Sequence, residues 1–188
     1  MLNWLGKKTG TAAVSSDMIS KQRRYETLVR ALHGDLYRYA YWLCHDASVA
    51  EDLVQETFLR AWKALDSLKD DKAAKSWLIT ILRRENARRF ERKQLDLTDI
   101  DQCQVADQDS LSNEQVADHQ VLHRQMRMLS PEYREPLILQ VMYGFSGEEI
   151  AEILELNRNT VMTRLFRARN QLREALNPTQ ASRGHSNG

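Results

Sequence analysis

The sequence contains few residues that break or cross-link a chain. Its 188 residues include only 3 Pro, 7 Gly and 2 Cys. Cys44 and Cys103 form no CxxC pair, and two cysteines in a chain of this size do not make a disulfide scaffold. We therefore expect a reducing compartment and a cytoplasmic protein.

Long hydrophobic runs are absent as well. The first residues, MLNWLGKKTGTAAVSSDM, hold no apolar stretch of signal-peptide length, and no later segment approaches a membrane span. We therefore expect a soluble protein without direct membrane insertion. The formal net charge is only +1, so a nucleic-acid site would have to come from local clustering of basic residues.

Strand-like alternation of apolar and polar residues is missing, whereas apolar residues recur with helical spacing almost throughout. The sequence therefore predicts an all-α protein without internal repeats. Two helical domains are expected, at residues 20–94 and 119–177. Breaks in the first are predicted near Gly34, His45–Ser48 and Lys69–Lys72.

An acidic segment separates the two predicted domains. Residues 95–118 contain seven acidic residues, no Lys or Arg, and few large apolar side chains. This composition is typical of a solvated, flexible linker. Residues 1–19 are expected to form a disordered polar tail, and residues 178–188 a second one.

The segment SGEEIAEILELNRNTVMTRLFRARNQL, residues 146–172, changes from acidic to basic at its middle. Ser146 and Glu149 match a capping box, which predicts the start of one helix. Asn159 is the predicted N-cap of a second helix. The second helix has one apolar stripe, formed by Val161, Leu165, Ala168, Leu172 and Leu176.

Polar and basic residues lie opposite that stripe. They are Thr160, Thr163, Phe166 and Arg167, with Arg164 on the flank. Arginine can pair with guanine edges, and threonine can contact bases or phosphates. The pattern favours a DNA-reading helix-turn-helix; the alternative is an ordinary amphipathic hairpin with solvated arginines.

The run LSPEYREPLILQVMYGFSGEEIAEILELNRNTVMTRLFRARNQLREAL resembles the −35 recognition domain of extracytoplasmic-function sigma factors of bacterial RNA polymerase. Glu155 and Asn159 stand where the family often has Gly, and Met162 where some members have a basic residue. The resemblance implies −35 contacts by Arg158, Asn159, Thr160, Thr163, Arg164, Phe166 and Arg167.

The segment AEDLVQETFLRAWKAL, residues 50–65, predicts a helix with two different sides. One side is expected to be buried and comprises Ala50, Leu53, Thr57, Phe58, Ala61 and Leu65. The other carries Leu59 among polar residues, which from the residues alone fits either a partner surface or an isolated exposed leucine. The segment DLYRYAYWLC…AEDLVQETFLRAW is similar to the part of sigma factors that grips the clamp helices of the polymerase's largest subunit. That resemblance assigns Asp52, Gln55, Glu56 and Leu59 to the docking face.

The next predicted helix, residues 72–93, ends in a cluster of cations. Its anchors are Trp77, Leu78, Ile81 and Leu82, and only Glu85 and Glu91 offset the charge of its second half. The cluster fits either a solvated basic helix end or a groove for strand-separated DNA with an aromatic platform. The resemblance implies −10 contacts by Arg83, Arg84, Arg88, Arg89, Phe90, Arg92 and Lys93. Arg84 stands where many members have Asn.

The same resemblance implies a set of partners. They are core RNA polymerase, with the clamp helices of its largest subunit and the flap of its second-largest subunit, promoter DNA, and an anti-sigma factor. The acidic linker would thread the polymerase near the RNA path; the alternative is a plain spacer. No cofactor is expected.

Two other functions fit parts of the sequence. A stand-alone helix-turn-helix regulator would bind DNA as a dimer and use the N-terminal half as a sensor. A metal-dependent enzyme would use His119 and His123, spaced four apart, with Cys103 upstream, although two histidines alone are a weak metal signal. No catalytic Ser/His/Asp order, glycine-rich phosphate loop or carboxylate pair is present, so we expect a non-catalytic protein.

Overall fold

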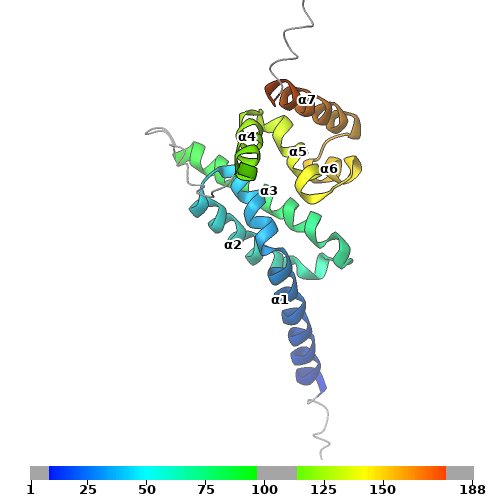
Figure 1. Cartoon of the computed structure of the whole chain (residues 1–188). Coiled ribbons are helices and arrows are strands. Elements are labelled where there is room, and N and C mark those ends of the chain that lie inside the picture. The colour runs from blue at the N-terminus through cyan, green and yellow to red at the C-terminus, as the bar shows by residue number, and fades with distance from the viewer. Residues whose placement is uncertain (1–8, 97–113, 177–188) are drawn as a thin grey trace, which may run out of the picture. The chain divides into compact units, whose positions relative to one another are not determined.

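The structure, a computed structural model, describes residues 9–96 and 114–176, with side chains described for residues 17–92 and 121–176. Within these ranges all regular structure is helical, so the all-α prediction is confirmed. The chain divides into two compact units, Met1–Gln104 and Val105–Gly188 (Figure 1). The predicted domains, 20–94 and 119–177, fall one within each unit. Residues 97–113 of the predicted linker and the predicted tail 178–188 lie outside the described residues, whereas residues 95–96 and 114–118 are helical, contrary to the linker prediction.

The described part of the first unit contains three α-helices and two short 3-10 turns. Its elements are α1 (Thr9–Cys44), α2 (Ala47–Ala64), η1 (Leu65–Ser67), η2 (Asp71–Ala73) and α3 (Ala74–Asp96). The described part of the second unit contains four helices, α4 (Glu114–Met128), α5 (Pro131–Tyr143), α6 (Gly147–Leu154) and α7 (Arg158–Leu176). No helix in the described parts of the chain is both long and apolar enough to cross a membrane.

Two predictions about α1 are wrong. The predicted tail, residues 1–19, is helical over residues 9–19, where the chain beyond Gly10 has no Pro or Gly to stop a helix; residues 1–8 lie outside the described residues. The predicted break at Gly34 does not occur either, and α1 continues through it to Cys44. A single glycine costs a helix only about 1 kcal/mol, and the packing of α1 on α2 and α3 outweighs that cost. The helix instead ends at His45, whose backbone φ of 55° is left-handed.

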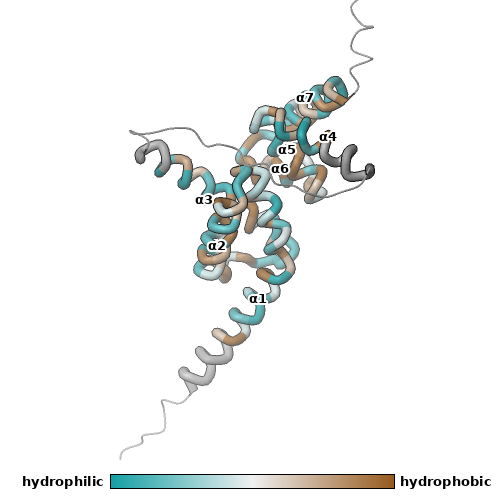
Figure 2. The backbone as a smooth tube through the Cα atoms, turned by 60° about the vertical axis from the view of Figure 1, so that its left-hand side comes forward, coloured by the Kyte–Doolittle hydropathy of each residue, from teal (hydrophilic) through white to brown (hydrophobic). Residues whose placement is uncertain are grey.

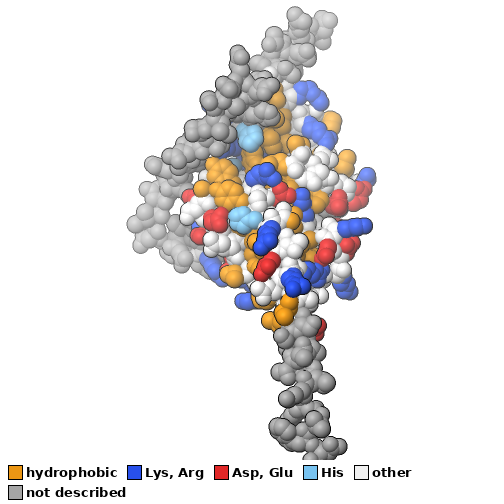
Figure 3. All heavy atoms as spheres, turned by 60° about the horizontal axis from the view of Figure 1, so that its bottom comes forward, with side chains coloured by type: hydrophobic (Ala, Val, Ile, Leu, Met, Phe, Trp, Pro, Cys, Tyr) orange, Lys and Arg blue, Asp and Glu red, His pale blue; other side chains and the backbone are white. Residues whose placement is uncertain are grey.

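Hydrophobic and hydrophilic residues alternate along the helices with helical spacing (Figure 2). The first unit buries Tyr39 of α1, Val54 of α2 and Leu78 of α3 almost completely. On the face drawn in Figure 3, basic and acidic side chains are interspersed among hydrophobic ones, in keeping with the net charge of +1.

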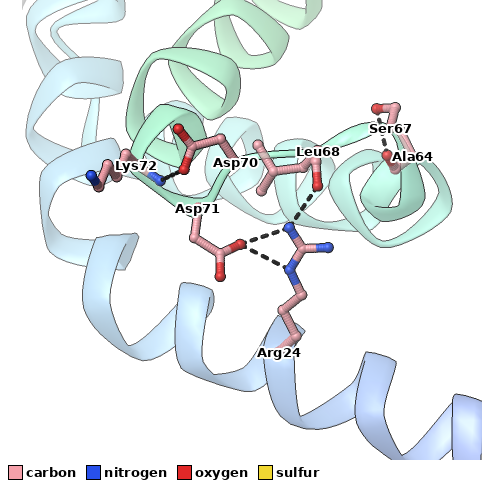
Figure 4. A network of polar contacts seen from close by, with 7 residues as sticks. All are labelled: Arg24, Ala64, Ser67, Leu68, Asp70, Asp71 and Lys72. Atoms are coloured by element: carbon pink, nitrogen blue, oxygen red, sulfur yellow. Dashed lines mark hydrogen bonds and ion pairs between the residues drawn. The ribbon is translucent and has the colours of Figure 1, made fainter.

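A polar network fixes the start of α3 against α1 (Figure 4). Arg24 donates from Nε and Nη2 to Oδ1 of Asp71, at 2.9 and 2.6 Å, and from Nη2 to the carbonyl oxygen of Leu68 at 2.6 Å. Asp70 accepts a hydrogen bond from the backbone N–H of Lys72 at 2.9 Å. This loop covers a small apolar cluster of Leu65, Leu68 and Ala74, packed by Tyr25, Leu28, Leu32 and Trp77. The network therefore ties the turn before α3 to α1.

Tight turns set the order of helices in the second unit. Gly144 ends α5 with a left-handed φ of 71°, and Ser146 and Glu149 form both hydrogen bonds of the capping box that begins α6. The capping-box prediction is thus confirmed. The core includes Leu139 of α5 and Ile150 of α6 together with Val161, Leu165 and Ala168 of α7. The predicted stripe on α7 does not extend to its end, since Leu176 is 40% exposed.

Candidate nucleic-acid and protein interfaces

The turn between α6 and α7 orients the basic helix. Glu155 ends α6 with a left-handed φ of 56°. The N-cap of α7 is Asn157. Its Oδ1 accepts two hydrogen bonds from Thr160, one from the backbone N–H at 2.8 Å and one from the hydroxyl Oγ1 at 2.9 Å. The prediction of Asn159 as the N-cap is therefore wrong: Asn159 lies one residue inside the helix, where its carbonyl oxygen accepts from Thr163 Oγ1 at 2.9 Å. The cap is two residues earlier because α6 ends in one left-handed residue, which shortens the turn.

An open hollow of about 580 Å³ lies beside the first turns of α7. Asn159, Thr160, Thr163, Arg164 and Arg167 line it from α7, and Asn157 lines it from the turn. Its remaining lining residues are Glu132 and Tyr133, in the first turn of α5. Five of the seven predicted −35 residues therefore share one concave surface; Arg158 and Phe166 are exposed nearby on the same helix.

The arginines of α7 contact polar groups on other helices. Nε of Arg158 pairs with Glu148 of α6. Nη2 of Arg164 lies 3.8 Å from Oε2 of Glu132, and Nη1 of Arg167 donates to the hydroxyl of Tyr133 at 3.3 Å. The Tyr133 hydrogen bond raises the pKa of Arg167. The contacts of Arg164 and Arg167 lie at the hollow, whereas Arg158 lies outside its lining.

Glu132 and Tyr133 did not stand out in the sequence. They precede the basic helix by more than twenty residues, and only the packing of α5 against α7 brings them to the hollow. Hydrophobic periodicity predicts which side of each helix is buried. It does not predict which end of α5 meets which turn of α7.

The exposed side of α2 carries the predicted docking residues. Asp52 and Gln55 are exposed, Glu56 is half-buried, and Leu59 is 57% exposed. All six residues predicted for the opposite side are buried, so the assignment of the two sides is confirmed. Leu59 is the exposed large hydrophobic side chain of α2, and the exposed Asp52 and Gln55 lie on the same side.

The cationic end of α3 extends beyond the core of the first unit. Arg83 is half-buried, whereas Arg84, Arg88, Arg89 and Arg92 are exposed and Phe90 is 55% exposed. Lys93 belongs to α3, but its side chain lies outside the described residues. Nη1 of Arg89 lies 4.0 Å from Oδ2 of Asp52, so the basic cluster and the exposed side of α2 adjoin each other.

A buried carboxylate joins α2 to this basic cluster. Glu85 is only 7% exposed, and its Oε1 lies 2.6 Å from Nε of Arg60 and 2.7 Å from Nη1 of Arg88. Arg60 also pairs with Glu56 at 3.1 Å. In the sequence Glu85 counted only as an offsetting charge, whereas in the structure it is the group about which these arginines are arranged.

The metal alternative gains no ligand set from the described residues. His123 is exposed, and the described part of the chain holds no group of three or more His, Cys, Asp or Glu side chains suited to a metal ion. Cys103 and the side chain of His119 lie outside the described residues.

The fold and these surfaces define a two-unit helical protein with a helix-turn-helix in its second unit. Residues 28–95 match the Sigma-70 region 2 family, and residues 119–172 match the Sigma-70 region 4 family. The ECF RNA polymerase sigma factor SigL of Mycobacterium tuberculosis is 34% identical over 157 residues, which cover 79% of this chain and 89% of SigL.

Solved structures agree with these relatives. The sigma factor RpoE from Bartonella quintana, solved in complex with the anti-sigma factor NepR, is 32% identical with a TM-score of 0.69, and the match covers 82% of this chain and 97% of that one. CnrH, solved with the cytosolic domain of CnrY, is 27% identical with a TM-score of 0.59, over 84% and 90% of the two chains.

The chain belongs to the ECF sigma factors of the sigma-70 family, which confirms the resemblance. It is an RNA polymerase sigma factor and directs promoter-specific transcription. The region 2 match also accounts for the N-terminal half, which a stand-alone regulator would have used as a sensor.

Proposed function

We propose that three surfaces divide the work of this sigma factor. The exposed side of α2 docks on core polymerase, the basic end of α3 binds the −10 element, and α7 reads the −35 element. The observation that carries the proposal is the hollow of about 580 Å³, in which two arginines and two threonines of α7 share one concave surface. Such side chains suit the base edges and phosphates of a major groove.

The docking surface comprises Asp52, Gln55, Glu56 and Leu59. Leu59 supplies an apolar contact, and the polar residues around it supply hydrogen bonds and charge. Interfaces commonly have such an apolar centre with a polar rim. The resemblance to extracytoplasmic-function sigma factors implies that this surface binds the clamp helices of the largest polymerase subunit.

The −10 surface comprises Arg83, Arg84, Arg88, Arg89, Phe90, Arg92 and Lys93. The exposed ring of Phe90 offers a stacking platform, and the arginines around it offer contacts to phosphates. This combination is typical of proteins that hold single-stranded nucleic acid. Arg84 in place of the common Asn implies that this chain captures its −10 base differently from many relatives.

A second contact with polymerase is expected in the second unit. Met128 and Val141 are 72% and 66% exposed there, which is consistent with an apolar partner. The resemblance to sigma factors implies that this partner is the flap of the second-largest polymerase subunit. The relatives RpoE and CnrH, solved with NepR and CnrY, support a further partner, an anti-sigma factor.

The protein would act as a non-catalytic initiation subunit in the cytoplasm, where polymerase transcribes the chromosome. The test is run-off transcription with purified core polymerase, this chain and a library of genomic fragments. Transcripts that begin at defined points only when the chain is present support the proposal. Transcription with the same start points in its absence would contradict it.

A further inference from the structure

The hollow has a second wall that does not belong to the helix-turn-helix. Glu132 and Tyr133, in the first turn of α5, line it together with the residues of α7. Tyr133 is half-buried and Glu132 is exposed. Their polar groups meet the two arginines of α7 that lie in the hollow: the Tyr133 hydroxyl meets Arg167, and the Glu132 carboxylate meets Arg164.

We infer that Tyr133 and Glu132 are positioning residues that set the base specificity of the −35 interface, an inference that rests on the proposed role of α7. Arginine reads guanine only if both donors of one edge of its guanidinium lie in the plane of the base. A guanidinium has five N–H donors. The Tyr133 oxygen accepts from Nη1 of Arg167 at 3.3 Å and leaves the other donors available. The side chain thereby has one favoured direction instead of many.

Glu132 acts on Arg164 in a different way. A carboxylate in a hollow that receives DNA repels phosphates, which costs affinity for every sequence. Its attraction for Arg164, 3.8 Å away, competes with phosphates for that guanidinium. Non-specific binding is mainly phosphate binding, so the acid penalises non-specific DNA more than a sequence in which bases satisfy Arg164. Such a repulsive element is a recognised route to specificity.

Holoenzyme formed from core polymerase and the full chain provides the test. It is allowed to select from promoter fragments randomised across the −35 segment of a promoter mapped by run-off transcription, and the bound fragments are sequenced. Arg167→Ala marks the base position that Arg167 reads. Tyr133→Phe, which removes only the hydroxyl, is expected to reduce preference at that same position about fivefold, the effect of one ordinary hydrogen bond, and to leave the other positions unchanged.

Glu132→Gln is expected to relax preference at the position marked by Arg164→Ala and to raise recovery of scrambled fragments severalfold. Glu152→Gln is the matched control, because it removes the same charge from an exposed site on α6 outside the hollow. Equal effects of Glu132→Gln and Glu152→Gln would mean that net charge alone acts, and would overturn the role of Glu132.

The possible outcomes distinguish a failure of this inference from a failure of the proposed −35 function of α7. A Tyr133→Phe profile identical to the wild type, beside an Arg167→Ala profile that has lost a position, overturns the inference and leaves the function of α7 intact. If Arg167→Ala and Arg164→Ala also leave the profile unchanged, the assignment of α7 to the −35 element fails, and the inference fails with it. Thermal melting of each variant confirms that the fold is retained.

Discussion

On α7 the guanidinium groups contact polar groups of α5 and α6. On α3, Arg88 pairs with the buried Glu85 of the same helix, and Arg89 lies 4.0 Å from Asp52 of α2. The first arrangement fixes the direction of individual side chains. The second concentrates positive charge beside the exposed ring of Phe90. The first arrangement suits binding of a rigid duplex, whose base edges have fixed positions, and the second suits binding of a flexible single strand.

The two units also differ in the number of candidate binding surfaces that each presents. The second unit presents one concave hollow formed by two helices and a turn. The first unit presents two adjoining surfaces, the exposed side of α2 and the basic end of α3, linked by Glu56, Arg60, Glu85 and Arg88. The first unit is therefore suited to combining a protein contact with a DNA contact.

The largest effect is expected from Leu59→Asp, which places a charge at the apolar centre of the docking surface. This variant should abolish association with core polymerase and leave the fold intact, because Leu59 contributes little to the core. Co-purification with core enzyme is the measurement. Met18→Asp, at an apolar residue of α1 with a similar exposure of 52%, is the control and should bind normally. Normal binding by Leu59→Asp would show that the docking surface lies elsewhere.

Arg167→Ala should lower transcription from a cognate promoter about ten- to a hundredfold, as expected for loss of one base contact. Arg173→Ala removes the same charge from the last turn of α7, away from the hollow, and should have a small effect. Run-off transcription at several salt concentrations measures both variants. Equal losses would indicate that the two arginines act only through charge.

Glu85→Ala should destabilise the first unit by about 2 kcal/mol. A charge network broken at its buried member is strongly destabilised, and the partial exposure of Arg60 and Arg88 moderates the loss. All four tryptophans precede residue 78, so tryptophan fluorescence during urea denaturation reports on this unit alone. Glu91→Ala, at an exposed acid of the same helix, is the control. A denaturation midpoint for Glu85→Ala equal to that of the control would refute the role of Glu85.

The smallest effect concerns pH. Burial raises the pKa of Asp35, but hydrogen bonds from Lys75 and Arg38 outweigh burial and leave this pKa below its ordinary value. The folded state therefore binds this proton less readily than the unfolded state. The stabilisation is present above about pH 4 and is lost as the pH falls through the folded pKa. Because solvent screens the group, we expect a loss below about 1 kcal/mol.

Asp35→Asn should remove that component. The free energy of unfolding of the first unit, measured by tryptophan fluorescence at pH 7 and about pH 3, should fall less in Asp35→Asn than in the wild type. An equal fall in both proteins would rule out a contribution from Asp35.

Local signals in the sequence predicted much of this architecture. The capping box at Ser146 depends on residues three apart, and the two sides of α2 follow directly from helical spacing. The cap of α7 was harder, because Asn157 and Asn159 are equally good caps and the backbone of Glu155 decides between them. The prediction of a break at Gly34 was wrong because tertiary packing of α1 outweighs the weak preference of glycine against helix.

Contacts between distant segments could not be predicted in the same way. Glu132 and Tyr133 reach the hollow through the packing of α5 on α7, and the buried Glu85 pairs with Arg60 of α2. Each of these residues has an unremarkable sequence neighbourhood. Their roles depend on helix directions, which a single sequence does not specify.

The most direct measurement compares duplex reading with strand opening in one holoenzyme. Phe90→Ala and Arg167→Ala holoenzymes are bound to the same promoter. Protection of the −35 segment and permanganate reactivity of thymines in the −10 segment are then followed together. We expect Phe90→Ala to retain −35 protection and lose thymine reactivity, and Arg167→Ala to lose both in parallel. Loss of −35 protection in Phe90→Ala, or unchanged reactivity of its thymines, would contradict the division of work between α3 and α7.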